Sequence, residues 1–275
     1  MIMRFQGGLK KALTLSYDDG VEQDARLIAI LNEHGIKATF NINSGLFAKE
    51  GHVYPAGQVH RRMPLSAAKA LYLGSGHEVA AHGLMHEWIT ELPAAMQTRE
   101  VLLDRENLER EFGGMIRGMA YAYGAYNDQT VQILRDCGVA YCRTVNATHR
   151  FDIPQDWLRL HPTCHHADPD LMVLCDRFLA DEARFASRLF YLWGHSYEFE
   201  GADNWPVIEA FARKMGAHAD VWYATNIEIV DYVNAYRQLI ASADGRTLHN
   251  PTATRLWVEE AGVVYEIGPG ETLKR

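Results

Sequence analysis

The sequence predicts an α/β protein built as a (β/α) barrel of seven or eight strands. Short apolar runs alternate with helical patterns over roughly the first 240 residues, which is typical of βαβ units around a parallel sheet. Seven or eight such repeats fit a closed or nearly closed barrel better than an open sheet. Residues with catalytic potential follow several of the apolar runs, and barrel active sites lie at the carboxyl ends of the strands.

Five strands and four helices are expected in the first half of the chain. The strands are expected at 12–16, 37–43 and 78–81, within 115–123, and at 139–145. The helices are expected at 25–34, 65–73, 92–112 and 128–136, and several end near a glycine that suits a C-cap. A long loop, 44–63, follows the second strand, and a connection of that length is often functional.

The second half continues the alternation and then changes character. Strands are expected within 157–164 and at 189–193 and 221–224, with helices within 169–185 and at 206–215 and 228–240. From about residue 243, two apolar runs at 256–258 and 263–267 flank a turn that contains glycine, which predicts a β-hairpin. We therefore expect a barrel domain at 1–242 and a C-terminal β-hairpin appendage at 243–275, which would cover the barrel or build a subunit interface.

Composition limits the partners that the protein can have. The 275 residues are 48% hydrophobic and 23% charged, which is ordinary for a globular protein. The net charge is −8 and no basic run is present, so no nucleic-acid partner is expected. We expect no membrane partner, and a cytoplasmic protein with four reduced cysteines, because there is neither an apolar run of membrane length nor a signal peptide. A homo-oligomer is compatible with these features.

Two short stretches supply the chemistry of a metal site. Asp18 and Asp19 precede a glycine at the end of the first strand, and His82 and His86 lie four residues apart after the third. One aspartate with two histidines is a ligand set that leaves room for water and substrate on a catalytic metal. The remaining carboxylate can act as a base beside that water. Asp-Asp-Gly is also ordinary turn chemistry, but the two stretches together indicate metal-assisted hydrolysis.

Further histidines lie near other strand ends. His195 follows the seventh strand and is a candidate general acid, with a buried structural histidine as the alternative. His161, His165 and His166 form a second cluster near Asp168, which we interpret as a polar wall of the substrate pocket rather than a second metal site. Three tryptophans are candidates for sugar stacking or for core packing: Trp157, Trp193 and Trp205.

At these positions the chain resembles the polysaccharide deacetylase family, the NodB-homology domain of carbohydrate esterase family 4. The first family motif, Thr-Phe-Asp-Asp-Gly, corresponds to Ser-Tyr-Asp-Asp-Gly at 16–20. The second, His-(Ser/Thr)-x-x-His, corresponds to His-Gly-Leu-Met-His at 82–86, and the fifth, a strand end followed by histidine, to Leu-Trp-Gly-His at 192–195. Motif order and barrel period match over roughly residues 10–240, so the resemblance implies the deformed TIM barrel of that family.

The resemblance also implies roles for individual residues. A divalent metal, expected to be zinc, would be held by Asp19, His82 and His86. Asp18 would be the general base that deprotonates the attacking water, and the backbone N–H of Tyr123 would help to stabilise the oxyanion. His195 would protonate the leaving amine or alcohol, and acetate would depart without a covalent enzyme intermediate. The residues expected to contact substrate are Trp193, Tyr123, Gly124, Arg143, His165 and His166.

Two family motifs are altered in this chain. The third, Arg-x-Pro-Tyr-Gly, reads Ala-Tyr-Ala-Tyr-Gly at 120–124, so the arginine that pairs with the base in the family is missing. We expect Arg143, at the end of the fifth strand, to supply that charge to Asp18 from a neighbouring position. The fourth motif, Asp-x-x-Asp-Trp, has no secure counterpart: 152–157 resembles it in letters, whereas 165–168 lies nearer its expected place.

The sequence therefore predicts a cytoplasmic, metal-dependent deacetylase that removes an N-acetyl or O-acetyl group from a sugar or short glycan. Its expected partner is a small-molecule or oligosaccharide substrate. One alternative is a hydrolase of non-sugar C–N bonds, such as cyclic amides, which the altered third and fourth motifs allow. Another is a non-catalytic, metal-bearing carbohydrate-binding module, and the missing arginine is its only support.

Overall fold

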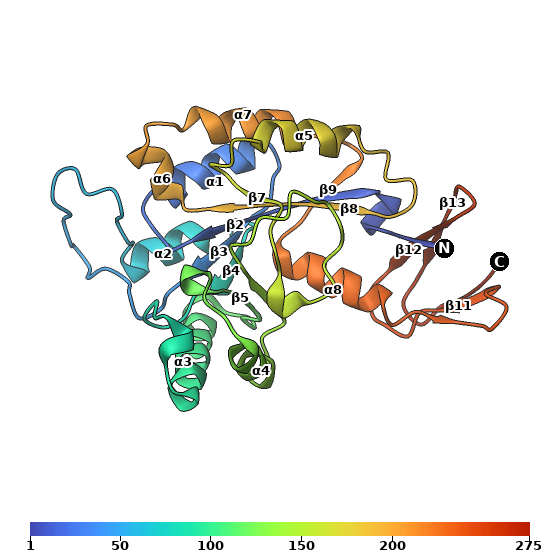
Figure 1. The fold of residues 1–275 in the computed structure, drawn as a ribbon, viewed down its shortest axis with the longest axis horizontal. Helices are drawn as coiled ribbons and strands as arrows, with labels where there is room; N and C mark the ends of the chain where they lie inside the picture. The colour runs from blue at the N-terminus through green and yellow to red at the C-terminus, as the bar shows by residue number, and fades with distance from the viewer.

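A curved parallel sheet forms the centre of the computed structural model, which describes all 275 residues (Figure 1). Seven strands follow the order β6-β5-β4-β3-β2-β8-β7, and β9 pairs with the first residues of β2. These strands are β2 (Lys11–Asp18), β3 (Thr39–Ile42), β4 (Glu78–Ala81), β5 (Gly118–Ala120), β6 (Tyr141–Arg143), β7 (Cys164–His165), β8 (Arg188–Gly194) and β9 (Val221–Tyr223). The predicted α/β class is confirmed, as a half-barrel that is incompletely closed.

The gap between β6 and β7 is spanned by an irregular segment. Leu160 forms an isolated parallel bridge with Arg143, and the Thr163 N–H donates to the Tyr191 carbonyl oxygen of β8 at 2.8 Å. The sequence prediction of a strand within 157–164 is therefore wrong for most of its length. A 3-10 helix, η4 (Trp157–Arg159), begins it, and Pro162 has no N–H to continue a ladder.

Helices cover the outer face of the curved sheet. Helices α1, α5 and α7 lie together on one side of the molecule, and α3 and α4 lie on the opposite side (Figure 1). The α-helices are α1 (Asp24–Glu33), α2 (Leu65–Tyr72), α3 (Ala94–Phe112), α4 (Asp128–Asp136), α5 (Leu171–Ala180), α6 (Ser196–Gly201), α7 (Pro206–Met215) and α8 (Asn226–Tyr236), and the other 3-10 helices are η1 (Gln6–Gly8), η2 (Ile89–Glu91) and η3 (Ala122–Gly124). None of these helices combines the length and apolar character needed to cross a bilayer.

The main apolar core lies between the sheet and its helices. Leu13 and Leu15 of β2 pack there with Phe190 and Leu192 of β8, because alternate residues of a strand point to the same face. The intervening positions of β2 carry Thr14, Ser16 and Asp18, whose side chains therefore point into the barrel. Asp18, the last residue of β2, therefore ends a row of polar side chains that points into the barrel.

Two helices differ from the sequence prediction. The last helix, α8, ends at Tyr236 rather than at 240, because Ile240 already belongs to a strand. The short helix α6 was not predicted, since six residues are too few to show a helical period.

Two small three-stranded sheets lie at the end of the molecule opposite the long loop that follows β3 (Figure 1). One contains β1 (Ile2–Arg4), β12 (Leu256–Glu260) and β13 (Val263–Ile267), and the other contains β10 (Ile240–Ala241), β11 (Thr247–His249) and β14 (Thr272–Lys274). The hairpin expected near the C-terminus is β12–β13, but it also pairs with β1, where Met3 lies opposite Val258. Buried Arg4 donates to Glu259 at 2.7 Å across this pairing.

Candidate metal centre and active site

The carboxyl end of β2 delivers two adjacent aspartates into one site. Asp18 is the last inward-facing residue of the strand, and Asn41 of β3 donates one amide proton to it at 2.7 Å and another to Ser16 at 2.7 Å. The chain then turns sharply, with φ of 83° at Asp19 and 63° at Gly20. This turn lets the two consecutive carboxylates both approach His82, although strand geometry would point them to opposite faces.

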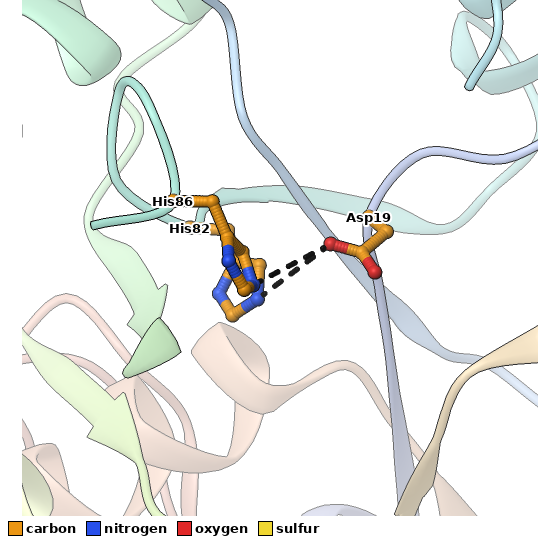
Figure 2. A group of neighbouring side chains, drawn as sticks. All are labelled: Asp19, His82 and His86. Atoms are coloured by element: carbon orange, nitrogen blue, oxygen red, sulfur yellow. Dashed lines mark ion pairs between the residues drawn. The ribbon is translucent and has the colours of Figure 1, made fainter. Parts of the chain in front are cut away.

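Three side chains are grouped as a metal site would require (Figure 2). Asp19 Oδ1 lies 4.0 Å from His82 Nε2 and 3.7 Å from His86 Nε2. Two ligands held at 2.0–2.1 Å in tetrahedral geometry are about 3.4 Å apart. An ion would therefore need only a small inward movement of these side chains.

The two imidazoles are also in the protonation state that a metal needs. His82 Nδ1 lies 2.9 Å from the carbonyl oxygen of Ala120, so it carries the proton and leaves the Nε2 lone pair toward Asp19. Burial lowers the pKa of His82, and burial together with neighbouring His82 lowers the pKa of His86 to about 4. Neutral imidazoles with free lone pairs fit a divalent cation.

The long loop after β3 supplies two unpredicted partners of Asp19. His60 Nε2 lies 3.1 Å from Asp19 Oδ2, and Arg62 donates to Asp19 Oδ1 at 3.0 Å and to the Asp19 carbonyl oxygen at 2.8 Å. Burial would raise the pKa of Asp19, but these contacts and His82 hold it well below its usual range. The length of the loop was the only sequence signal that pointed to these residues.

Asp18 is paired with a buried arginine from another strand. Arg143, fully buried at the end of β6, contacts the Asp18 carboxylate, and its guanidinium lies 4.2 Å from the ring centre of Trp193. Burial alone would raise the pKa of Asp18, but Arg143, His82 and His195 lower it overall. The structure thus brings together the two residues that the sequence predicted as a charge pair.

His195 lies on the other side of Asp18 and is held by a carboxylate that the sequence did not predict at the site. His195 Nε2 is 3.8 Å from Asp18 Oδ2, and its Nδ1 is 3.0 Å from Glu198 Oε1 on α6. Glu198 Oε2 lies 3.2 Å from His165 Nε2 and 2.9 Å from His166 Nε2. These are hydrogen-bond separations, so Glu198 collects three imidazoles around one carboxylate.

The contacts among these histidines and carboxylates shift the pKa values of His195 and Glu198. Burial would lower the pKa of His195, but the hydrogen bond to Glu198 and the charges of Asp18 and Asp19 raise it. The hydrogen bonds from the three histidines lower the pKa of Glu198 despite its burial. A histidine with a raised pKa is suited to donate a proton near neutral pH.

For a reaction in which His195 donates a proton, replacing Glu198 with glutamine is expected to move the alkaline limb of the kcat/KM pH profile to lower pH by roughly one unit. The carboxylate stabilises the imidazolium of His195, so its loss lowers the pKa and the acid form disappears earlier as pH rises. Asp18, His165, His166 and Tyr197 also face this ring and are unchanged in the variant. Glu209→Gln, on the outer side of α7, is the control, and an unmoved limb in Glu198→Gln would contradict the assignment.

The other predicted residues divide between the site and its surroundings. His161 does not join the second cluster, because its Nδ1 lies 2.6 Å from Thr144 Oγ1, and Asp168 pairs with His149. Gly124 is required by the backbone, since its φ is 68° and a Cβ there would lie 2.4 Å from Val145. The three tryptophans considered for sugar stacking are all buried: Trp157, Trp193 and Trp205.

Unusual backbone conformations concentrate at the site. Eight non-glycine residues have positive φ, and three of them, Asp19, His86 and Tyr123, lie together here. The ring of Tyr123 packs against His86 at a centroid distance of 4.5 Å. Such conformations cost free energy and tend to persist where function requires them.

Solved structures with this architecture define the class of fold. A Mycobacterium smegmatis protein classed with the polysaccharide deacetylases is 16% identical, with 85% of this chain and 93% of that chain covered and a TM-score of 0.60. A family 4 carbohydrate esterase from Streptomyces lividans, solved with acetate, is also 16% identical, with 78% and 93% covered and a TM-score of 0.50. At these identities the likeness establishes the deformed (β/α) barrel that these proteins share.

The sequence comparison identifies the family. The polysaccharide deacetylase family model matches residues 6–142, which include the three-ligand group of Asp19, His82 and His86 and the neighbouring Asp18. The chain belongs to the polysaccharide deacetylase family. An uncharacterized Streptomyces coelicolor protein is 26% identical over 153 residues, 54% of this chain, and the match spans about half, 55%, of that relative.

Proposed function

We propose that the protein is a metal-dependent hydrolase that removes an N-linked or O-linked acetyl group from a sugar or short glycan. The observation that carries this proposal is the position of Asp18 Oδ2, which lies 3.8 Å from His82 Nε2 in the three-ligand group and 3.8 Å from His195 Nε2. A base thus sits between a metal site and an acid. The membership of the family supports deacetylation as the reaction.

Each residue has a defined part in the proposed reaction. A divalent metal held by Asp19, His82 and His86 would polarise the acetyl carbonyl and lower the pKa of water, and zinc suits this ligand set. Asp18 would take a proton from the attacking water, with its carboxylate oriented by Asn41 and Arg143. The backbone N–H of Tyr123 would donate to the developing oxyanion.

The second proton transfer would use the opposite side of the pocket. His195, oriented by Glu198, would donate its Nε2 proton to the leaving nitrogen or oxygen as the C–N or C–O bond breaks. The water oxygen stays with the acyl carbon, so the products are acetate and the free amine or alcohol. His165 and His166, which share Glu198, would form the polar wall of this side, and Trp193 would support it through Arg143.

The alternatives that the sequence left open receive less support. A pure binding module would not need both Asp18 and His195, each held by its own charged partner. The proposal includes a cytoplasmic location, where the protein would meet short glycans rather than intact wall polymer. It is also compatible with a homo-oligomer. A panel of acetylated sugars and cyclic amides separates sugar deacetylation from hydrolysis of other C–N bonds.

Metal content is the first test of the proposed centre. Protein purified without chelator is expected to hold about one equivalent of zinc or a similar ion, and Asp19→Ala is expected to lose it together with acetate release. Asp176→Ala, which removes an exposed carboxylate on α5, should retain both. Full activity after chelation and verified loss of metal would contradict the mechanism.

A further inference from the structure

The last residues of the long loop after β3 run beside the turn that carries Asp19. Val21 and Arg62 form an antiparallel bridge between the two segments. His60 and Arg62 both contact the Asp19 carboxylate, whereas Arg61, between them, makes neither a hydrogen bond nor an ion pair with it. An influence of Arg61 on the position of Asp19 therefore passes through its two neighbours in the chain.

Arg61 joins carboxylates from two different elements. Its Nε donates to Glu22 Oε2 at 2.6 Å, and its terminal nitrogens donate to the two oxygens of Glu200 at 2.7 and 3.0 Å. Glu22 lies in the turn after β2, and Glu200 lies on α6. The planar guanidinium matches a carboxylate through such paired bonds, which a lysine cannot reproduce.

Buried Gln23 belongs to the same network. Its Nε2 donates to the Val59 carbonyl oxygen at 2.6 Å and to Glu200 Oε2 at 2.9 Å. An isolated ion pair at the surface holds a structure weakly, but paired bonds within a connected network hold it more firmly. The loop, the turn after β2 and α6 are thus fastened to one another beside the three-ligand group.

We propose that Arg61 is a positioning residue for Asp19: by joining Glu22 and Glu200, it holds the loop so that His60 and Arg62 stay on the Asp19 carboxylate. This inference rests on the proposed function, in which Asp19 is a metal ligand. Partners that hydrogen-bond to a ligating carboxylate fix its orientation, and their loss typically weakens metal binding by about 10–100-fold.

The expected direction distinguishes positioning from simple electrostatics. Removing a positive charge near a cation site would, by Coulomb's law alone, strengthen the binding of the cation. Loss of the Arg61 side chain is instead expected to weaken zinc binding, because His60 and Arg62 would remain present but no longer be held on Asp19. The effect should lie at the lower end of the range for direct partners of a ligand.

The test measures the zinc dissociation constant of metal-free protein against a chelating dye. Arg61→Ala is expected to raise this constant about tenfold, and Arg61→Lys is expected to restore only part of the affinity. Arg26→Ala is the matched control, because Arg26 is also exposed and joins α1 to α7 through Glu209 at 3.0 Å. This control should bind zinc as the wild type does.

A double-mutant cycle shows whether Arg61 acts through its neighbours. In a His60→Ala/Arg62→Ala background, Arg61→Ala should weaken zinc binding no further, and a tenfold loss that persists there would overturn the proposal. Where that background fails to fold or to bind zinc, Glu200→Gln decides. It removes part of the clamp without touching the loop, so it should weaken zinc binding in the same direction as Arg61→Ala, and wild-type affinity would contradict the proposal.

Failure of the proposed function is distinguishable, because zinc affinity is measured without substrate. A wild type that binds zinc but releases no acetate would contradict deacetylation, and the comparison of variants would still decide the role of Arg61. Equal zinc affinity of Arg61→Ala and the wild type would overturn the positioning role alone. A wild type that binds no zinc would overturn both the metal centre and this role.

Discussion

Changing Asp18 to asparagine is expected to lower kcat for acetate release by about 10²–10⁴-fold, the usual contribution of a general base. The amide keeps the size of the side chain and can still accept from Arg143, but it cannot take a proton. Since Asp18 is not one of the three proposed ligands, the variant should bind metal as the wild type does. Acetate release and metal content are measured on the same preparation.

The matched control is Asp181→Asn. Asp181 also pairs with an arginine, Arg188, at 2.7 Å, but at the opposite end of β8. Its replacement should leave turnover close to wild type. An Asp18→Asn enzyme that keeps its metal and turns over within a few-fold of wild type would show that another group is the base.

Arg143→Ala is expected to reduce both stability and activity. Removing one partner of a buried ion pair typically costs about 3–5 kcal/mol, and here the change also removes the support beneath Trp193. The uncompensated Asp18 would lose its fixed orientation, so we expect kcat/KM to fall at least about 100-fold. Thermal unfolding and acetate release measure the two effects separately.

Arg135→Ala is the control for the loss of an arginine, and Arg143→Lys tests whether a positive charge alone is sufficient. Arg135 is exposed on α4, where it donates to Gln132 at 2.8 Å, so its loss should change stability by less than about 0.5 kcal/mol. Arg143→Lys keeps the positive charge without the planar fork and should recover part of the activity. Equal effects of Arg135→Ala and Arg143→Ala would exclude a role for Arg143 beside the base.

The residues that the sequence placed in the site are those with a local signal. Asp18 and Asp19 close a strand, His82 and His86 lie four residues apart after another strand, in a loop rather than on a helical turn, and His195 follows a third strand. In a parallel sheet the carboxyl ends of the strands meet at one edge, so strand assignment alone placed these groups together. Arg143 could be proposed for the same reason, as the residue that ends the neighbouring strand β6.

The missed residues depend on contacts that sequence spacing does not encode. His60 and Arg62 lie in a loop without periodicity, and the bridge between Val21 and Arg62 brings that loop to Asp19 across about forty residues. Glu198 lies on α6, and because six residues are too few to show a helical period, its position three residues after His195 gave no signal of its own. The incomplete closure near Pro162 follows from the 3-10 helix η4 and from the missing backbone N–H of the proline, which outweigh the strand propensity of the segment.

The pairing of β1 with β12 sets the order in which the chain can complete its fold during synthesis. Arg4 and its partner Glu259 are 255 positions apart, so at ordinary translation speeds the first strand leaves the ribosome tens of seconds before its partner. Until then it has no neighbour to pair with, and the charge of Arg4 stays hydrated. The opposite end of the barrel can assemble earlier, and the end covered by β1 is completed only when β12 has been synthesised.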